Sequence, residues 1–136
     1  MLNTIRRRFF RAQFVVTFAL LLAPVSAFPT STFHLALKRS EPAKDSTLDH
    51  APTAITLWFT QKPEMAVTTI SLLDARAVKI EMADPRVDAT DATVVIADVK
   101  GRVGPGTYTA RWKTSSHDGH VVRGEFGFTV RAPASK

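Results

Sequence analysis

Apolar and polar side chains alternate in short runs along most of this chain, and this period of two most restricts the fold. Thr107–Lys113 is such a run, and it places Tyr108, Ala110 and Trp112 on one face of a predicted strand. Because successive side chains of a strand point to opposite faces, one face should be buried and the other exposed to solvent. No stretch after residue 33 combines the 3.6-residue period of an amphipathic helix with helix caps. The main element is therefore the β-strand.

Short strands of this kind recur along the chain with turn residues between them, such as those around Gly104. About seven short strands at spacings of roughly 8 to 15 residues predict an all-β fold, an immunoglobulin-like antiparallel β-sandwich. The expected strands are His34–Lys38, Ile55–Thr60, Thr68–Leu73, Val78–Met82, Thr93–Ala97, Thr107–Lys113 and Val121–Val130, the last with Phe126, Phe128 and Val130 as its inward row.

The start of the chain has the three parts of a secretory signal peptide. They are a basic head at Arg6–Arg11, an apolar run at Phe14–Ala23 and a small-x-small cleavage site at Val25–Ala27. A membrane anchor is the alternative, but a spanning helix needs about 20 apolar residues and this run is shorter. The arginines at Arg6–Arg8, followed by two phenylalanines, also resemble a twin-arginine signal, so the export route stays open. We expect an exported protein.

Cleavage after Ala27 divides the chain into four parts. These are a signal peptide at 1–27, a flexible leader at 28–33, a single domain at 34–131 and a tail at 132–136. The chain has no cysteine, so no disulfide stabilises the fold in an oxidising compartment and core burial must do so.

The net charge of +6 resembles that of a nucleic-acid-binding protein, but it comes mainly from the signal peptide. Four of the 18 Lys and Arg residues lie within the first eleven positions, which leaves 14 against 12 Asp and Glu from Phe28 onward. A body with a charge of only +2 gives no electrostatic reason to expect nucleic-acid binding. We therefore exclude DNA and RNA as partners.

The stretch Ser115–His120 carries the residues best suited to chemistry. Asp118 and His120 lie on either side of Gly119, and His117 precedes them directly. Imidazole nitrogen together with carboxylate oxygen suits copper(II), nickel or zinc, whereas a copper(I) or iron–sulfur site would need sulfur ligands. The other interpretation is a simple turn, in which the aspartate caps local amides and the glycine supplies a positive φ.

Three motifs lie along the predicted domain. They are His34-x-x-Leu37-x-x-Ser40-x-Pro42-Ala43, Ile55-x-Leu57-x-Phe59, and a C-terminal set made up of Tyr108, Trp112, Ser116, Asp118, Gly119, His120, Gly124, Phe128 and Val130. In this order, they resemble the N-terminal motif, the second strand and the C-terminal signature of the CopC family of periplasmic copper-binding proteins. The matches fall in the same order and span His34 to Val130, so together they are far more specific than Asp-Gly-His alone.

The resemblance implies a seven-stranded sandwich that binds copper(II) through an N-terminal histidine and the Asp-x-His motif. The corresponding residues here are His34, Asp118 and His120. Copper(II) prefers a tetragonal set of nitrogen and oxygen ligands, which agrees with this assignment. The chain departs from the family in one respect: after cleavage at Ala27, His34 is the seventh residue and offers an amide where the family has a free amine.

The fourth ligand of the copper is open at this stage: water, His117 or the new N-terminus folded back along the leader. As a strand residue, His117 would point away from Asp118. His50 lies in a turn-like segment and is expected to have no role in binding. After cleavage the methionines are Met65 and Met82, so the copper(I) thioether cluster of some relatives has no counterpart.

We expect a periplasmic, monomeric protein that buffers or carries copper for homeostasis or resistance, without catalysis. The motifs contain no activated nucleophile. The enzyme alternative is a copper monooxygenase that uses a histidine brace, but Phe28 at the mature N-terminus argues against it. A third reading is an exported sandwich that binds a protein partner and no metal. The resemblance also raises an inner-membrane copper transporter as a possible partner.

Overall fold

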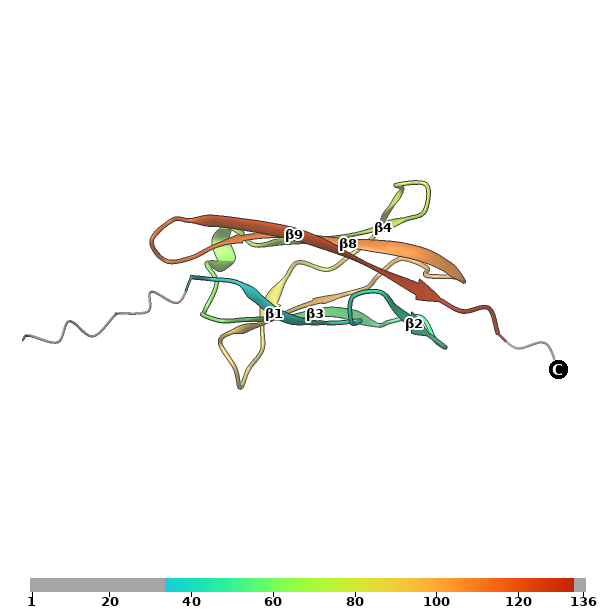
Figure 1. Ribbon diagram of the computed structural model, residues 1–136, viewed down its shortest axis with the longest axis horizontal. Helices are drawn as coiled ribbons and strands as arrows, with labels where there is room; N and C mark the ends of the chain where they lie inside the picture. The colour runs from blue at the N-terminus through green and yellow to red at the C-terminus, as the bar shows by residue number, and fades with distance from the viewer. Residues whose placement is uncertain (1–33, 134–136) are drawn as a thin grey trace, which may run out of the picture. The chain divides into compact units, whose positions relative to one another are not determined.

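Two β-sheets packed face to face form the domain (Figure 1). The computed structural model describes residues 34–133. The predicted signal peptide, the leader and the last three residues of the tail lie outside this range. The predicted all-β sandwich is confirmed. Within the described range, no helix is both long enough and apolar enough to span a membrane.

One sheet has four strands in the order β1-β3-β7-β6, and the other has five in the order β2-β9-β8-β4-β5. Neighbouring strands are antiparallel except β2 and β9, which are parallel. The strands are β1 (Leu37–Glu41), β2 (Ser46–Leu48), β3 (Ala54–Phe59), β4 (Thr69–Asp74), β5 (Lys79–Ile80), β6 (Arg86–Val87), β7 (Val94–Asp98), β8 (Gly106–Ser115) and β9 (Val121–Val130), and a 3-10 turn, η1 (Met65–Val67), precedes β4.

The expectation of about seven strands, all antiparallel, needs correction. The structure has nine strands in the described range, and the two additional ones, β2 and β6, are three and two residues long. Runs this short are too brief to show an alternating pattern in the sequence. The chain crosses from one sheet to the other between β1 and β2, so β2 joins the second sheet beside β9 and runs in the same direction.

As predicted, every second side chain of β3 points into the core. Ile55, Leu57 and Phe59 are at most 1% exposed, while Trp58 lies on the opposite, partly exposed face beneath the guanidinium of Arg39. Apolar side chains from both sheets meet in one buried cluster, which stabilises the fold through removal of apolar surface from water. This single continuous core stabilises the sandwich, which contains no disulfide.

The inward row of β8 is also confirmed. Tyr108 and Ala110 are buried, and Trp112 is partly buried with its ring in an edge-to-face contact with Phe59. The run Val78–Met82 is less regular than predicted, because only two of its residues form strand β5 and Val78 is 54% exposed.

The longest strands, β8 and β9, form a hairpin that is paired over its full length, from Gly106 opposite Val130 to Ser115 opposite Val121. Figure 1 shows this hairpin in orange and red, with its tip near the start of β1. The tip is the loop that contains the Asp-Gly-His sequence, so the fold fixes that loop at one end of the sandwich.

Candidate metal site

The loop at the hairpin tip has a defined backbone geometry. The N–H of Ser116 donates to the carbonyl of His120 at 3.0 Å, and the N–H of Gly119 donates to the carbonyl of Ser116 at 2.9 Å. Gly119 has a φ of 84°, which a residue without a side chain adopts at no steric cost. This is the three-residue hairpin loop in which a turn is followed by a left-handed residue. It places the side chains of Asp118 and His120 two residues apart around the bend.

Hydrogen bonds fix the carboxylate of Asp118 within the loop. The hydroxyl of Ser116 donates to Oδ1, and the backbone N–H of His120 donates to the same atom at 3.4 Å. Chiefly because of the Ser116 hydrogen bond, and next because of the His120 N–H, the pKa of Asp118 is lowered to about 2. Asp118 is therefore an anion at any physiological pH and needs no deprotonation to bind a cation.

Asp118 and His120 have the spacing of two neighbouring ligands of one ion. Nδ1 of His120 lies 3.1 Å from Oδ2 of Asp118. Imidazole nitrogen and carboxylate oxygen bind zinc at roughly 2.0–2.2 Å, and two such atoms at a right angle around one ion are about 3 Å apart. The hydrogen-bonded separation is thus close to the ligand–ligand distance, and a small rotation of the two exposed side chains would turn both donor atoms toward one ion.

His34 is held beside this loop by its neighbours and not by a strand, because β1 begins only at Leu37. The adjacent side chain of Leu35 is 4% exposed and belongs to the core. The hydroxyl of Thr60, at the end of β3, donates to the carbonyl of His34 at 2.8 Å and accepts from the N–H of Ala36 at 2.9 Å. The backbone of His34 is thus anchored while its side chain remains exposed.

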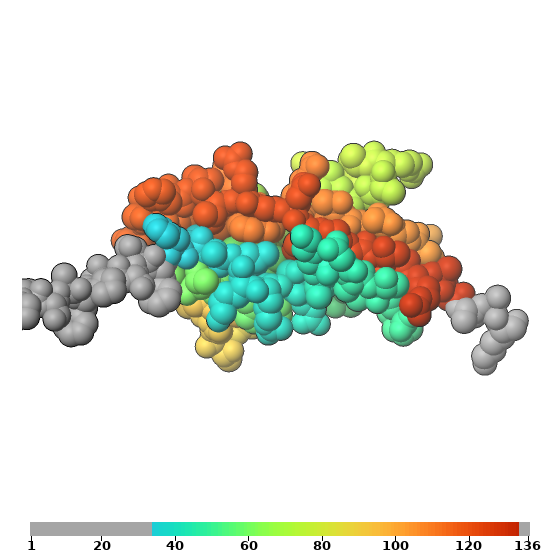
Figure 2. All heavy atoms as spheres, in the orientation of Figure 1, coloured from blue at the N-terminus to red at the C-terminus, as the bar shows by residue number. Residues whose placement is uncertain are grey.

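The three predicted ligands line a single surface depression with a volume of about 490 Å³. In Figure 2 the first described residues, in cyan, lie against the orange tip of the hairpin. Its lining residues are His34, Leu35, Gln61, Ser116, His117, Asp118, His120, Val121 and Val122. Across residues 34–133, no three His, Asp or Glu side chains already converge on a single ion position. Binding by all three residues therefore requires rotation of exposed side chains, which cost little to reorient.

The side chain of His117 makes a separate contact. Its Nδ1 lies 3.1 Å from Oε1 of Glu64, which follows the buried Pro63 in the segment between β3 and η1. Neither Glu64 nor Gln61 was predicted as a site residue, because both approach the hairpin through tertiary packing across more than 50 positions of sequence. Isolated polar residues in a turn carry no periodic or motif signal.

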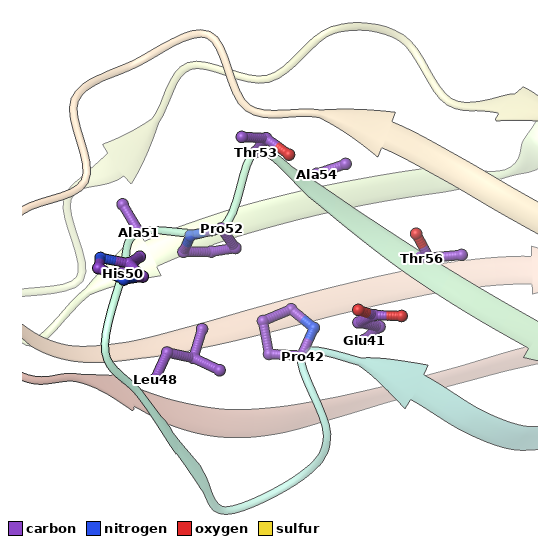
Figure 3. Close-up of a pocket in the computed structure, with 9 residues that line it drawn as sticks. All are labelled: Glu41, Pro42, Leu48, His50, Ala51, Pro52, Thr53, Ala54 and Thr56. Atoms are coloured by element: carbon purple, nitrogen blue, oxygen red, sulfur yellow. The ribbon is translucent and has the colours of Figure 1, made fainter.

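His50 lies far from this site. It lines another depression, together with Glu41, Pro42, Leu48 and residues at the start of β3 (Figure 3). Strand β2, just before His50, pairs with the end of β9 near Val130, whereas His120 precedes the start of β9. A ten-residue strand spans roughly 30 Å, so His50 serves as a distant control for the site.

Comparisons with known proteins agree with the fold and the motifs. The family description "CopC domain" matches residues 37–131. Copper resistance protein C of Xanthomonas campestris pv. juglandis is 31% identical over 125 residues, which cover 88% of this chain and 94% of that protein. Protein YobA of Escherichia coli strain K12 is 28% identical over 103 residues, covering 76% and 83%. The crystal structure of CopC from Methylosinus trichosporium OB3b is similar with a TM-score of 0.67 and 23% sequence identity, over 76% of this chain and 99% of that chain. At this identity the similarity supports the fold alone.

Proposed function

Because the chain belongs to the CopC family, we propose that it binds copper for copper homeostasis or resistance and carries the ion, as copper(II), without changing it chemically. The ion is cargo, taken up and released, and not a resident cofactor. The observation that carries this proposal is the meeting of His34 and the Asp118–His120 pair around one depression, although they lie more than 80 positions apart in the sequence.

The ligands we assign are His34, Asp118 and His120. Two imidazole nitrogens and one carboxylate oxygen are a donor set that copper(II) prefers, and copper(II) stands at the top of the divalent affinity order. Since His117 lies against Glu64, we assign the fourth position to water. The Asp118 carboxylate, ionised throughout the physiological range, supplies the negative charge that partly offsets that of the ion.

The exposure of the site suits a carrier. The side chains of Asp118 and His120 are 67% and 82% exposed, so an incoming chelator can reach a bound ion directly. The hydroxyl of Ser116 donates to the carboxylate of Asp118, whose pKa of about 2 makes it too weak a base to activate the serine as a nucleophile. A monooxygenase reaction makes a different prediction, turnover of a substrate by the copper-loaded protein with peroxide, and we expect none.

Export through the signal peptide at residues 1–27, with cleavage after Ala27, is part of this proposal. Phe28 then becomes the N-terminus and His34 contributes its imidazole without a free amine. Mass spectrometry of the secreted protein tests this point. Cleavage directly before His34 would restore the amine ligand and would contradict the assigned processing site.

A competitive copper(II) titration tests the ligand assignment. We expect His34→Ala, Asp118→Asn and His120→Ala each to weaken binding by at least about 10-fold, since each removes one donor of a chelate. His50→Ala is the matched control, because it removes an imidazole roughly 30 Å away and should leave the affinity unchanged. Equal affinity in all four variants would contradict the site, and absence of copper binding in the unmodified protein would contradict the function.

A further inference from the structure

The hairpin tip presents two imidazole–carboxylate pairs, and the assigned copper site uses one of them. Nδ1 of His117 is 3.1 Å from Oε1 of Glu64, the same separation as between His120 and Asp118. We propose that Glu64 and His117 form a second, weaker copper(II) site beside the first. This inference rests on the proposed function in one respect, the identity of the ion.

Glu64 is held in place by its backbone. Its N–H donates to the carbonyl of Ser115 at 2.9 Å, and its carbonyl accepts from the hydroxyl of Thr68 at 2.7 Å. That hydroxyl is in turn 2.7 Å from the hydroxyl of Thr114 in a buried contact between β8 and the residue preceding β4. The backbone of Glu64 is therefore anchored beside Ser115, the last residue of β8 and two positions before His117, so the pair is built by the fold and not by a local turn.

The two pairs are distinct although His117 and Asp118 are adjacent in sequence. The oxygens of Asp118 contact Ser116 and His120, whereas the imidazole of His117 contacts a residue 53 positions away. A separation of 3.1 Å is close to the roughly 3 Å expected for two neighbouring ligands of one ion at a right angle. Each pair is a hydrogen-bonded contact that becomes a two-donor site when its exposed side chains rotate to turn both donor atoms toward one ion.

The second site is the weaker one for two reasons. It offers one nitrogen and one oxygen, with water completing the coordination, whereas the first site has three protein ligands. An ion already bound at Asp118 and His120 also repels a second dication nearby. The exposed fractions of His117 and Glu64 are 99% and 47%, which leaves the pair open to solvent at the rim of the depression. Such a site holds an ion during entry to or departure from the first.

The test is a copper(II) titration of the purified protein, monitored by competition and by electron paramagnetic resonance at one and two equivalents. We expect two bound ions, the second at least about 10-fold weaker, with dipolar broadening of the spectrum when both are present. Glu64→Gln and His117→Ala should each abolish the second ion and change the first affinity by less than about 2-fold. His50→Ala should leave both ions in place.

Other results of this titration would contradict the second site, the proposed function or both. One ion per protein, or a second ion that persists in both Glu64→Gln and His117→Ala, overturns the second site while the proposed function stands. If His117→Ala weakens the first ion 10-fold or more, His117 is a ligand of the first site and the inference is wrong. If the unmodified protein binds no copper, both proposals fail. Circular dichroism of each variant confirms that it is folded, as expected for substitutions of exposed side chains.

Discussion

Gly124→Ala tests why the hairpin that carries the site has a glycine opposite Trp112. A Cβ at position 124 would lie 2.7 Å from Cζ2 and 2.9 Å from Cε2 of the indole. The ring has little room to withdraw, because it packs edge-to-face against Phe59, which is 1% exposed, with 5.4 Å between ring centroids. Gly124 therefore provides the space that the tryptophan occupies.

Two opposing contributions determine whether Gly124→Ala raises or lowers the free energy of unfolding. Replacing glycine by alanine restricts the unfolded chain and stabilises a protein by about 0.4–1 kcal/mol where the new methyl group fits. Overpacking beside a rigid aromatic ring costs about 1–3 kcal/mol. We therefore expect Gly124→Ala to lower the free energy of unfolding by about 1–2 kcal/mol, which for a domain of this size lowers the melting temperature by roughly 5–15 °C.

The matched control is Gly104→Ala, because apart from the adjacent residues no heavy atom lies within 4 Å of a Cβ at Gly104. Thermal and guanidinium unfolding should show the loss at Gly124 and no loss at Gly104, and copper affinity should be unchanged in both variants. Equal stability of the two variants would refute the packing argument. A weaker copper affinity in Gly124→Ala would mean that this glycine acts on the site and not on the core.

Four further outcomes are expected. Ser116→Ala should raise the pKa of Asp118 from about 2 toward its ordinary value near 3.8, measured by carboxyl-carbon NMR titration. Because the pKa of Asp118 is lowered in the folded state, the ionised carboxylate contributes its full stabilisation above pH 3.8 and loses it as the pH falls through about 2. The free energy of unfolding of Ser116→Ala should therefore change less over that pH range than that of the unmodified protein. Thr114→Val should cost about 1 kcal/mol in chemical denaturation, because it removes the buried hydroxyl contact with Thr68. Copper affinity should fall as the pH is lowered, because protons compete with the ion for imidazole nitrogen, and binding that is constant down to about pH 4 would exclude histidine ligands. Free copper at 100 times its dissociation constant should add about 2.7 kcal/mol of stability, and an unchanged melting temperature would show that copper does not favour the folded form.

Strands with a buried face could be predicted from the sequence. The alternation in Ile55–Thr60 and Thr107–Lys113 corresponds closely to β3 and β8, because one face of each strand packs into the core. The very short strands β2 and β6 could not be predicted. They are strands because they pair with β9 and β7, and their own residues show no alternating pattern. The parallel pairing of β2 likewise depends on where the chain crosses between sheets.

The candidate site was predictable only in part. Asp118, Gly119 and His120 form a local motif, and their turn follows from the sequence because a glycine after an aspartate favours a tight hairpin loop. The contact of His117 with Glu64 could not be predicted, since it depends on how the segment after β3 packs against the end of β8. The same holds for the position of His34, which Thr60 fixes through two hydrogen bonds.

The most direct measurement of the central claim is pulsed electron paramagnetic resonance of the protein with one equivalent of copper(II), compared between the unmodified chain and His34→Ala. If His34 and His120 bind the same ion, the spectrum of the unmodified protein contains two imidazole nitrogens and that of His34→Ala contains one. Identical spectra for the two proteins, or the spectrum of hydrated copper in both, would contradict a site shared between the start of the domain and the hairpin tip.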